Sequence, residues 1–277
     1  MESPRDECMK TFDPRHVRKT ILDMAHSGST VHIGCAFSIV ELLTTLYRSH
    51  LRFDPAHPDA PDRDYMVLSK GHGVMAQYAC LHELGILSDA DLSQYFKNGT
   101  RLKGLADAHV PGVEVTAGSL GHGLSVGVGL ALAAKLNKTD QICYVLVGDG
   151  EINEGAIWEA MLFAAHFKLD NLIVIVDKNG FQAMGSTDEV MMLGNIQKKF
   201  EAFGFETITL DGHDEDAISA AYGDLKASRN GQPKAIVANT VKGRGVSFME
   251  HDNIWHYTRL DSETYAQALS AVTGSTQ

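Results

Sequence analysis

The sequence of 277 residues lacks several features that would mark particular classes of protein. No apolar run approaches the roughly 20 residues that span a bilayer, so we expect no contact with a membrane. The stretch 1–7 is acidic and has no apolar core, so we do not expect a signal peptide. The net charge of −11 argues against a nucleic-acid partner, because phosphate binding requires clustered Lys and Arg.

Cysteine is scarce, and the four residues form no CxxC pair: Cys8, Cys35, Cys80 and Cys143. Three of them sit in apolar stretches, which is typical of reduced, buried thiols. Their spacing does not predict a zinc site. The pattern fits a reducing, cytoplasmic location.

The composition is ordinary for a soluble globular protein, with 44% hydrophobic and 21% charged residues. Continuously apolar runs alternate with stretches of helical spacing, which indicates an α/β fold with a mostly parallel sheet and helices on both faces. We expect one domain over residues 1–277, with a C-terminal helical tail.

The apolar runs predict strands at residues 65–68, 141–147, 172–176, 205–210 and 235–241. Helices are expected at 13–24, 36–47, from the 69–73 turn to about 84, and at 124–136, 154–167, 214–227 and 261–272. The stretch 124–136 is rich in Ala, Gly and Leu. We expect it to be a tightly packed, buried helix.

Two polar anchors follow two successive apolar runs. Asp149 stands in a Gly-Asp-Gly segment after the first run, and Asn179 follows the second. Neighbouring parallel strands bring such residues together, and Mg²⁺ prefers oxygen ligands alongside phosphate oxygens. The carbonyl of Phe181 can serve as a third ligand, and Gly150 lets a diphosphate approach the backbone closely. The pattern predicts a divalent-cation and diphosphate site.

Four histidines lie in loops beside this expected ligand edge: His32, His72, His122 and His256. A loop imidazole is more often a surface or capping group than a catalyst. None of the four shows the i, i+4 spacing of a helical metal site. Hydrogen bonding and proton transfer to a polyhydroxylated substrate explain the group better. His122 also ends a glycine-rich loop, Gly118-Ser119-Leu120-Gly121, that can receive a flat ring or a phosphate.

Together these segments resemble transketolase over nearly the whole chain. The matching pieces, in order, are His32-Ile33-Gly34, Ser69-Lys70-Gly71-His72, the stretch 111–121, Gly148-Asp149-Gly150 to Glu154, the stretch 169–179 and Lys242-Gly243-Arg244-Gly245. The stretch from Gly-Asp-Gly to Asn179 looks like the thiamine-diphosphate motif of that family.

The resemblance implies a role for each of these residues. Asp149, Asn179 and the carbonyl of Phe181 would hold Mg²⁺ or Ca²⁺. Thiamine diphosphate would be contacted by His72, Gly118, Ser119, Leu120, Asp149, Gly150, Glu154, Asn179 and His256. The residues implied in catalysis are His32, His72, His256 and Glu154. Glu154 would reach across an interface to the active site of a second copy, although its position one helical turn past the motif also suits a helix cap.

The resemblance covers only the family's diphosphate-binding domain. It implies the N-terminal subunit of a split transketolase, which transfers a two-carbon ketol unit from a ketose or its phosphate to an aldehyde such as an aldose. A C-terminal subunit with the pyrimidine-binding domain would complete the site, in a heterotetramer.

Three positions depart from the family pattern near the substrate. Leu105 stands where transketolases have a histidine, and whether the nearby His109 compensates is left open by the sequence. His122 and Tyr257 replace the usual Gln and Gly. These departures suggest a non-standard donor or acceptor.

Other interpretations stay open. They are a transketolase-like enzyme with a 2-oxo acid donor, the alpha subunit of a 2-oxo acid dehydrogenase, a deoxyxylulose-phosphate-type synthase and a non-catalytic partner subunit.

Overall fold

The computed structural model describes residues 12–27 and 31–274. The N-terminal stretch 1–7 and Cys8, on which two of the predictions depend, lie outside these ranges. The centre is a five-stranded, entirely parallel sheet in the order β1-β2-β3-β7-β6. Its strands are β1 (Tyr65–Leu68), β2 (Cys143–Gly148), β3 (Leu172–Lys178), β7 (Lys234–Asn239) and β6 (Glu206–Asp211). The parallel sheet and all five predicted strands are confirmed.

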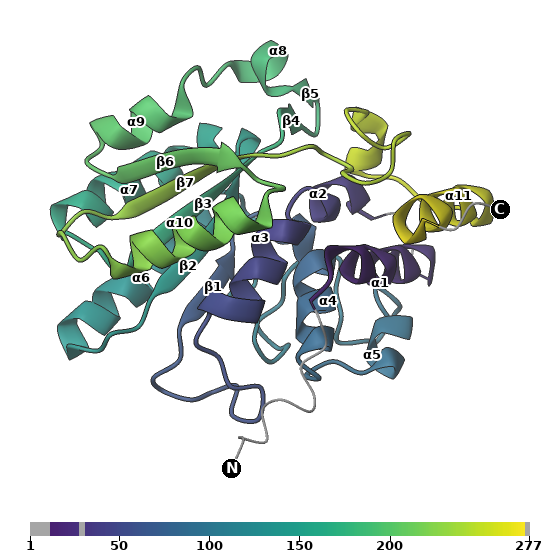
Figure 1. Cartoon of the computed structure of the whole chain (residues 1–277), viewed down its shortest axis with the longest axis horizontal. Helices are drawn as coiled ribbons and strands as arrows, with labels where there is room; N and C mark the ends of the chain where they lie inside the picture. Colours follow the sequence, from purple (N-terminus) through teal and green to yellow (C-terminus); the bar gives the residue numbers. More distant parts are fainter. Residues whose placement is uncertain (1–11, 28–30, 275–277) are drawn as a thin grey trace.

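Helices cover both faces of the sheet (Figure 1). They are α1 (Pro14–Ser27), α2 (Ile33–Phe37), α3 (Val40–Thr45), α4 (Val74–Glu83), α5 (Asp89–Ser93), α6 (His122–Asn137), α7 (Gly155–His166), α8 (Thr187–Met191), α9 (Ile196–Ala202), α10 (Glu215–Ala227) and α11 (Ser262–Thr273). Short turns of other helix types are η1 (Leu46–His50), η2 (Gly71–Gly73), η3 (Gly150–Asn153) and η4 (Asn253–His256), and a small ribbon joins β4 (Phe181–Gln182) to β5 (Gly185–Ser186).

The alternation of side chains along β3 shows how the two cores form. Ile173 and Ile175 point into the core that also contains α1 to α4 and α10. Val174 and Val176 point into the other core, beneath α6, α7 and α9. Because both faces are buried, the strand is apolar at every position up to its end, as the continuous run predicts.

The predicted helix at 36–47 is interrupted. It divides into α2 and α3, which continues into the π-helical turn η1. The break falls at Ser38, whose hydroxyl is fully buried and donates to Asp177 Oδ2 over 2.8 Å. Sequence spacing alone does not reveal this contact with the end of β3.

The prediction that 124–136 is a tightly packed, buried helix holds for the inner face of α6 and is wrong for its outer face. The inner face of α6 lies so close to β2 that a Cβ on Gly127 would be 2.3 Å from Val145. The outer face is open, with Val126 41% and Leu136 71% exposed. The small residues serve close packing on one side only, and the other side presents apolar surface.

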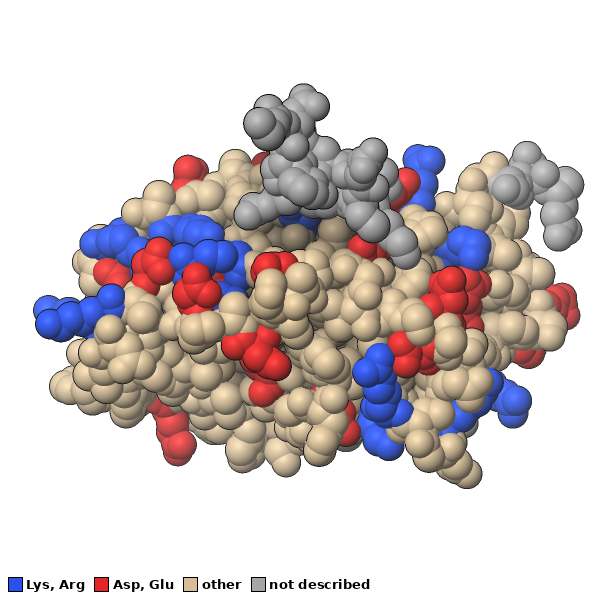
Figure 2. All heavy atoms as spheres, turned by 90° about the horizontal axis from the view of Figure 1, so that it is seen from below, with Lys and Arg blue, Asp and Glu red and all other residues tan. Residues whose placement is uncertain are grey.

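None of the described helices is both long and apolar enough for a membrane span. On the face shown in Figure 2, basic side chains are interspersed with acidic ones. Among the described residues, Arg52 pairs with both Asp64 and Asp140. That nucleic acid is not a partner stays a prediction from the net charge.

Candidate active site

Asp149 lies at the carboxyl end of β2 and is buried. Its Oδ1 accepts from the Gly150 amide over 2.8 Å, and its Oδ2 accepts from the Gly180 amide over 2.7 Å. Burial, and then the charge of Asp177, raise its pKa to about 6. A carboxylate that is held this rigidly and is short of positive charge suits a divalent cation.

Asn179 follows the neighbouring strand, β3, and its side chain is also buried. Its Nδ2 donates to Asp177 Oδ2 over 2.7 Å, and its Oδ1 accepts from the Phe181 amide over 3.0 Å. The structure thus brings the side-chain oxygens of Asp149 and Asn179, the predicted metal ligands, to the ends of adjacent strands. The chemistry of this donor set fits a hard cation, which would compete with the backbone amides for these oxygens.

Beneath these residues lies a polar centre that the sequence reasoning missed. Asp177 is fully buried and accepts from the Lys70 ammonium over 2.5 Å. Burial by itself raises the pKa of Asp177, but the Lys70 charge and the hydrogen bonds from Lys70, Thr240 and Ser38 together outweigh it and lower the pKa. Two hydroxyls complete its partners, from Ser38 and Thr240. The available signals were an acidic residue at the end of an apolar strand and a lysine in the Ser-Lys-Gly-His turn.

Glu151 is a second buried carboxylate that the sequence reasoning missed. It accepts from the Ser69 hydroxyl over 2.5 Å, from the Gly121 amide over 2.8 Å and from the Gly148 amide over 3.0 Å. One side chain therefore ties three turns together: the one after β1, the glycine-rich loop before α6 and the Gly-Asp-Gly segment. In the sequence, only the position of Glu151 next to the Gly-Asp-Gly segment indicated such a role.

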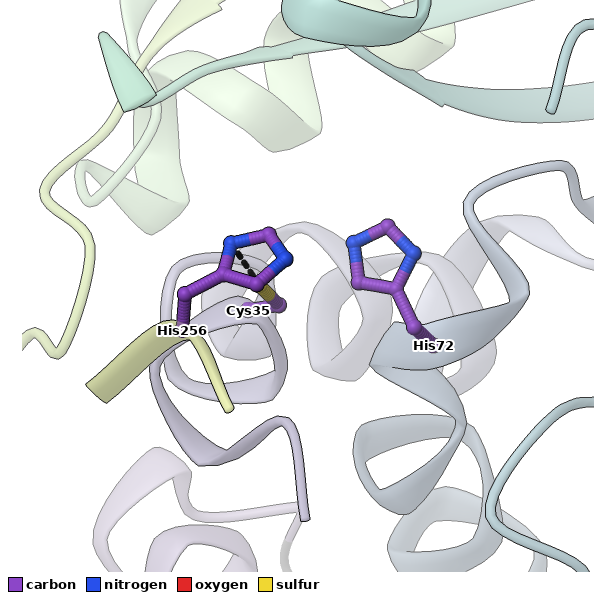
Figure 3. A group of neighbouring side chains, drawn as sticks. All are labelled: Cys35, His72 and His256. Carbon is purple, nitrogen blue, oxygen red and sulfur yellow. Dashed lines mark hydrogen bonds between the residues drawn. The ribbon is translucent and has the colours of Figure 1, made fainter. Parts of the chain in front are cut away.

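Three of the four loop histidines come together. The ring centroid of His32 lies 5.1 Å from that of His72 and 5.5 Å from that of His256, and the last two are 5.6 Å apart. Figure 3 shows His72 and His256 side by side, from η2 and η4. His122 does not join them, because it is exposed and its Nδ1 lies 3.3 Å from the Leu120 carbonyl oxygen.

Burial and nearby ammonium groups keep the three clustered imidazoles neutral. Burial, followed by the charge of Lys242, lowers the pKa of His32 to about 4 and that of His256 to about 3. The pKa of His72 is lowered as well, by burial and then by Lys70. A neutral imidazole can both accept and donate a hydrogen bond, as contact with substrate hydroxyls requires.

Lys242 is the fourth residue that the sequence reasoning left without a role. Its Nζ lies 2.7 Å from His256 Nδ1 and donates to Asn253 Oδ1 over 3.0 Å. Burial lowers its pKa. If the ammonium donates to Nδ1, the proton of His256 is on Nε2. The glycines after Lys242 in the sequence were the signal for a turn at this edge.

The remaining predicted contacts lie nearer the surface. Gly118, Ser119 and Leu120 form an exposed loop that leads into α6. Glu154 is exposed and occupies the N-cap position of α7, as the helix-cap alternative predicts, but its side chain makes no capping hydrogen bond.

Two of the three positions that depart from the family pattern, Leu105 and Tyr257, border a hollow of about 310 Å³. It is lined by Val31, His32, Phe96, Lys103, Gly104, Leu105 and Tyr257. The ring of Tyr257 lies 4.6 Å from that of His32. His109 does not take the place of the histidine that Leu105 replaces, because its exposed ring pairs with Asp107 over 2.7 Å.

The fold and this edge define a class: a parallel α/β domain with a polar, cofactor-sized site at the carboxyl ends of its strands. Residues 14–273 match the family described as transketolase, thiamine diphosphate binding domain. The chain therefore belongs to the transketolase family, whose members are transferases. The family and fold predicted from the sequence are confirmed.

Two similar relatives have about the same length as this chain, and both are named as subunits of a transketolase. The one from the apulose-4-phosphate transketolase of Phocaeicola vulgatus is 39% identical, over 92% of this chain and 90% of the relative. The 6-deoxy-6-sulfo-D-fructose transketolase subunit SqwG of a Clostridium species is 38% identical, over 92% of each.

Solved transketolase structures extend well beyond the matched region. The transketolase of Leishmania mexicana superposes with a TM-score of 0.87 at 32% identity, over 96% of this chain but 42% of its own. That of Campylobacter jejuni gives 0.88 at 30% identity, over 94% and 42%. The chain thus spans about two fifths of these transketolases.

Proposed function

We propose that this chain acts as a thiamine-diphosphate-dependent transketolase together with a second subunit. The complex transfers a two-carbon ketol unit from a ketose or ketose phosphate to an aldose or another aldehyde. The observation that carries the proposal is the match of residues 14–273 to the thiamine-diphosphate-binding domain, with Asp149 and Asn179 at adjacent strand ends. Retention of these donors disfavours the alternative of a non-catalytic partner subunit.

The described residues would hold the cofactor in two places. Asp149, Asn179 and the carbonyl of Phe181 would bind Mg²⁺ or Ca²⁺ and, through it, the diphosphate. The other parts of thiamine diphosphate would be contacted by the loop 118–120, Gly150 and the clustered histidines. The chemistry that thiamine diphosphate supplies when bound is cleavage of the carbon–carbon bond next to a ketone.

The side chains of this chain would orient the donor and move protons. His32, His72 and His256 are neutral, so each can accept a proton from a donor hydroxyl or donate to an oxygen that gains negative charge. Lys242 adds a positive charge 2.7 Å from His256 Nδ1. It would favour negative charge developing on the substrate next to that ring.

A partner is supported by the apolar surface and by the two relatives' names. The packed helices α6 and α7, with the C-cap residue of α7, expose large apolar side chains: Val126, Leu136, Leu162, Phe163 and Phe167. Such a surface is typical of a protein–protein interface. We propose that a C-terminal subunit with the pyrimidine-binding domain completes the site in a heterotetramer, with Glu154 at the interface. A cytoplasmic location stays a prediction.

A second candidate function is favoured by the hollow beside His32. Leu105 is 39% and Tyr257 54% exposed there, where the family pattern has a histidine and a glycine. We infer that the enzyme uses a non-standard donor or acceptor. The relatives' names point the same way, because they specify apulose 4-phosphate and 6-deoxy-6-sulfo-D-fructose. A 2-oxo acid donor is the further alternative.

The test is turnover by the complex of both chains. Ketol transfer from a panel of ketose phosphates, dependent on thiamine diphosphate and a divalent cation, would support the proposal. Release of carbon dioxide from a 2-oxo acid would support the further alternative instead. Full activity with xylulose 5-phosphate and ribose 5-phosphate would contradict the non-standard substrate but not the ketol transfer.

A further inference from the structure

A group of soft ligand atoms lies beside the oxygen donors of the cation site. The sulfur of Cys35 and ring nitrogens of His72 and His256 are all within 4.8 Å of one another. Figure 3 shows the three side chains converging from α2, η2 and η4. Cys35 Sγ lies 3.6 Å from His256 Nδ1. A tetrahedral zinc ion, bound at about 2.3 Å to sulfur and about 2.0 Å to nitrogen, separates these atoms by about 3.5 Å.

Close packing holds the three elements in place. Gly34 precedes the cysteine, and a Cβ there would lie 2.9 Å from the Trp255 carbonyl oxygen. Only a residue without a side chain lets α2 approach η4 so closely. Cys35 and His256 are 221 positions apart. The spacing of the cysteines predicted no zinc site, because this group forms only when segments distant in the sequence meet in the fold.

The surrounding charges bear on which ion fits. Lys70 donates to the Cys35 carbonyl over 3.0 Å, and Lys242 lies beside His256. Burial raises the pKa of the Cys35 thiol, and the charges of Lys70 and Lys242 offset part of that rise. Once the thiol proton has left, the thiolate neutralises part of an ion's charge. An ion on His256 Nδ1 displaces the Lys242 ammonium, which keeps its partner Asn253. Thiolate and imidazole ligands select zinc-class ions over Mg²⁺.

We propose that Cys35, His72 and His256 form a binding site for a zinc-class divalent ion, distinct from the oxygen-ligand site at Asp149 and Asn179. Binding releases the Cys35 thiol proton to solvent and leaves a fourth ligand position open. The ion binds ring nitrogens of His72 and His256 that, in the proposed transketolase reaction, contact thiamine diphosphate and the ketose substrate. Its presence therefore inhibits that reaction, whereas the binding itself does not depend on the proposed function.

Co²⁺ is the probe, because a thiolate ligand gives it a charge-transfer absorption in the near ultraviolet. Titration of the full chain is expected to produce this band, and added Zn²⁺ is expected to remove it. Cys35→Ser is expected to abolish the band and to weaken Zn²⁺ binding by at least about 100-fold. The matched control Cys80→Ser removes another buried thiol and is expected to keep the band.

A second ligand variant keeps the test independent of the cysteine. His256→Gln retains the thiol and is expected to weaken Co²⁺ binding by a similar factor, with its fold checked by thermal unfolding. Excess Mg²⁺ is expected to leave the band unchanged. The proposal is overturned if folded wild-type chain shows no thiolate band, if Cys35→Ser keeps it, or if Mg²⁺ competes for it.

Discussion

Lys70 and Asp177 form a buried ion pair, with 2.5 Å between Nζ and Oδ2, below the strand ends that carry the predicted cation ligands. The pair joins the turn after β1 to the end of β3. Four groups donate hydrogen bonds to the carboxylate, and the Lys70 ammonium also balances its charge: Lys70, Ser38, Asn179 and Thr240. The active-site edge therefore depends on this one buried carboxylate.

Removing the Lys70 ammonium while keeping the Asp177 carboxylate is expected to destabilise the fold. Lys70→Met leaves the Asp177 carboxylate buried without its ammonium, and we expect the free energy of unfolding to fall by about 3–5 kcal/mol. Urea unfolding measures this loss. The control is Lys19→Met, which breaks the half-exposed pair with Asp23 and should cost no more than about 1 kcal/mol. Equal losses in the two variants would contradict the role given to the buried pair.

Glu151 is expected to organise the cofactor loops. In Glu151→Gln one acceptor oxygen becomes a donor that faces a backbone amide, and we expect a loss of about 1–3 kcal/mol in the free energy of unfolding. Hydrogen exchange at the Gly121 and Gly148 amides should accelerate. Glu159→Gln, on the exposed side of α7, serves as the control. Unchanged exchange at both amides would argue against this role.

The charge of Asp149 should weaken the fold when no cation is bound. Its pKa of about 6 lies above the ordinary 3.8, so between these values the folded state binds more protons than the unfolded state and stability falls as pH rises. Above pH 6 the penalty amounts to roughly 3 kcal/mol at most. Asp149→Asn removes it.

The measurement is the difference in unfolding free energy between wild type and Asp149→Asn across pH, in chelator. The new amide group faces the Gly150 or Gly180 N–H and costs a similar amount at every pH. The difference in unfolding free energy is therefore expected to shift in favour of the variant between pH 4 and pH 8, while the variant loses cation-dependent cofactor binding. Asp188→Asn, at an exposed position of α8, should show no such pH dependence. A difference that does not shift toward the variant between pH 4 and pH 8 would show that the Asp149 charge does not destabilise the fold.

The clustered histidines should stay neutral over the working range of pH. His32 and His256, with pKa values lowered to about 4 and about 3, are expected to keep neutral NMR signals down to about pH 5. Because an unfolded histidine titrates near 6.5, their stability contribution is lost as pH falls below that value. Exposed His122 provides the comparison. Titration of the clustered rings near pH 6.5 would contradict their burial beside Lys242.

The sequence predicted the sheet well because its strands are buried on both faces and so are continuously apolar, as in β3. Asp149, Asn179 and three histidines were found because each sits at a strand end or in a loop with a recognisable pattern. Lys70, Glu151, Asp177 and Lys242 were missed because their roles come from partners distant in the chain. The exposed face of α6 was missed because composition does not say which molecule covers an apolar helix.

The central claim is that the cofactor site is divided between this chain and a second subunit. Calorimetric titration of thiamine diphosphate with Mg²⁺ into the chain, alone and mixed with its candidate partner, tests it most directly. We expect tight binding in the mixture only, and its loss when this chain carries Asp149→Asn. Tight binding by this chain alone would mean that it completes its own site and would contradict the division of the site between two chains.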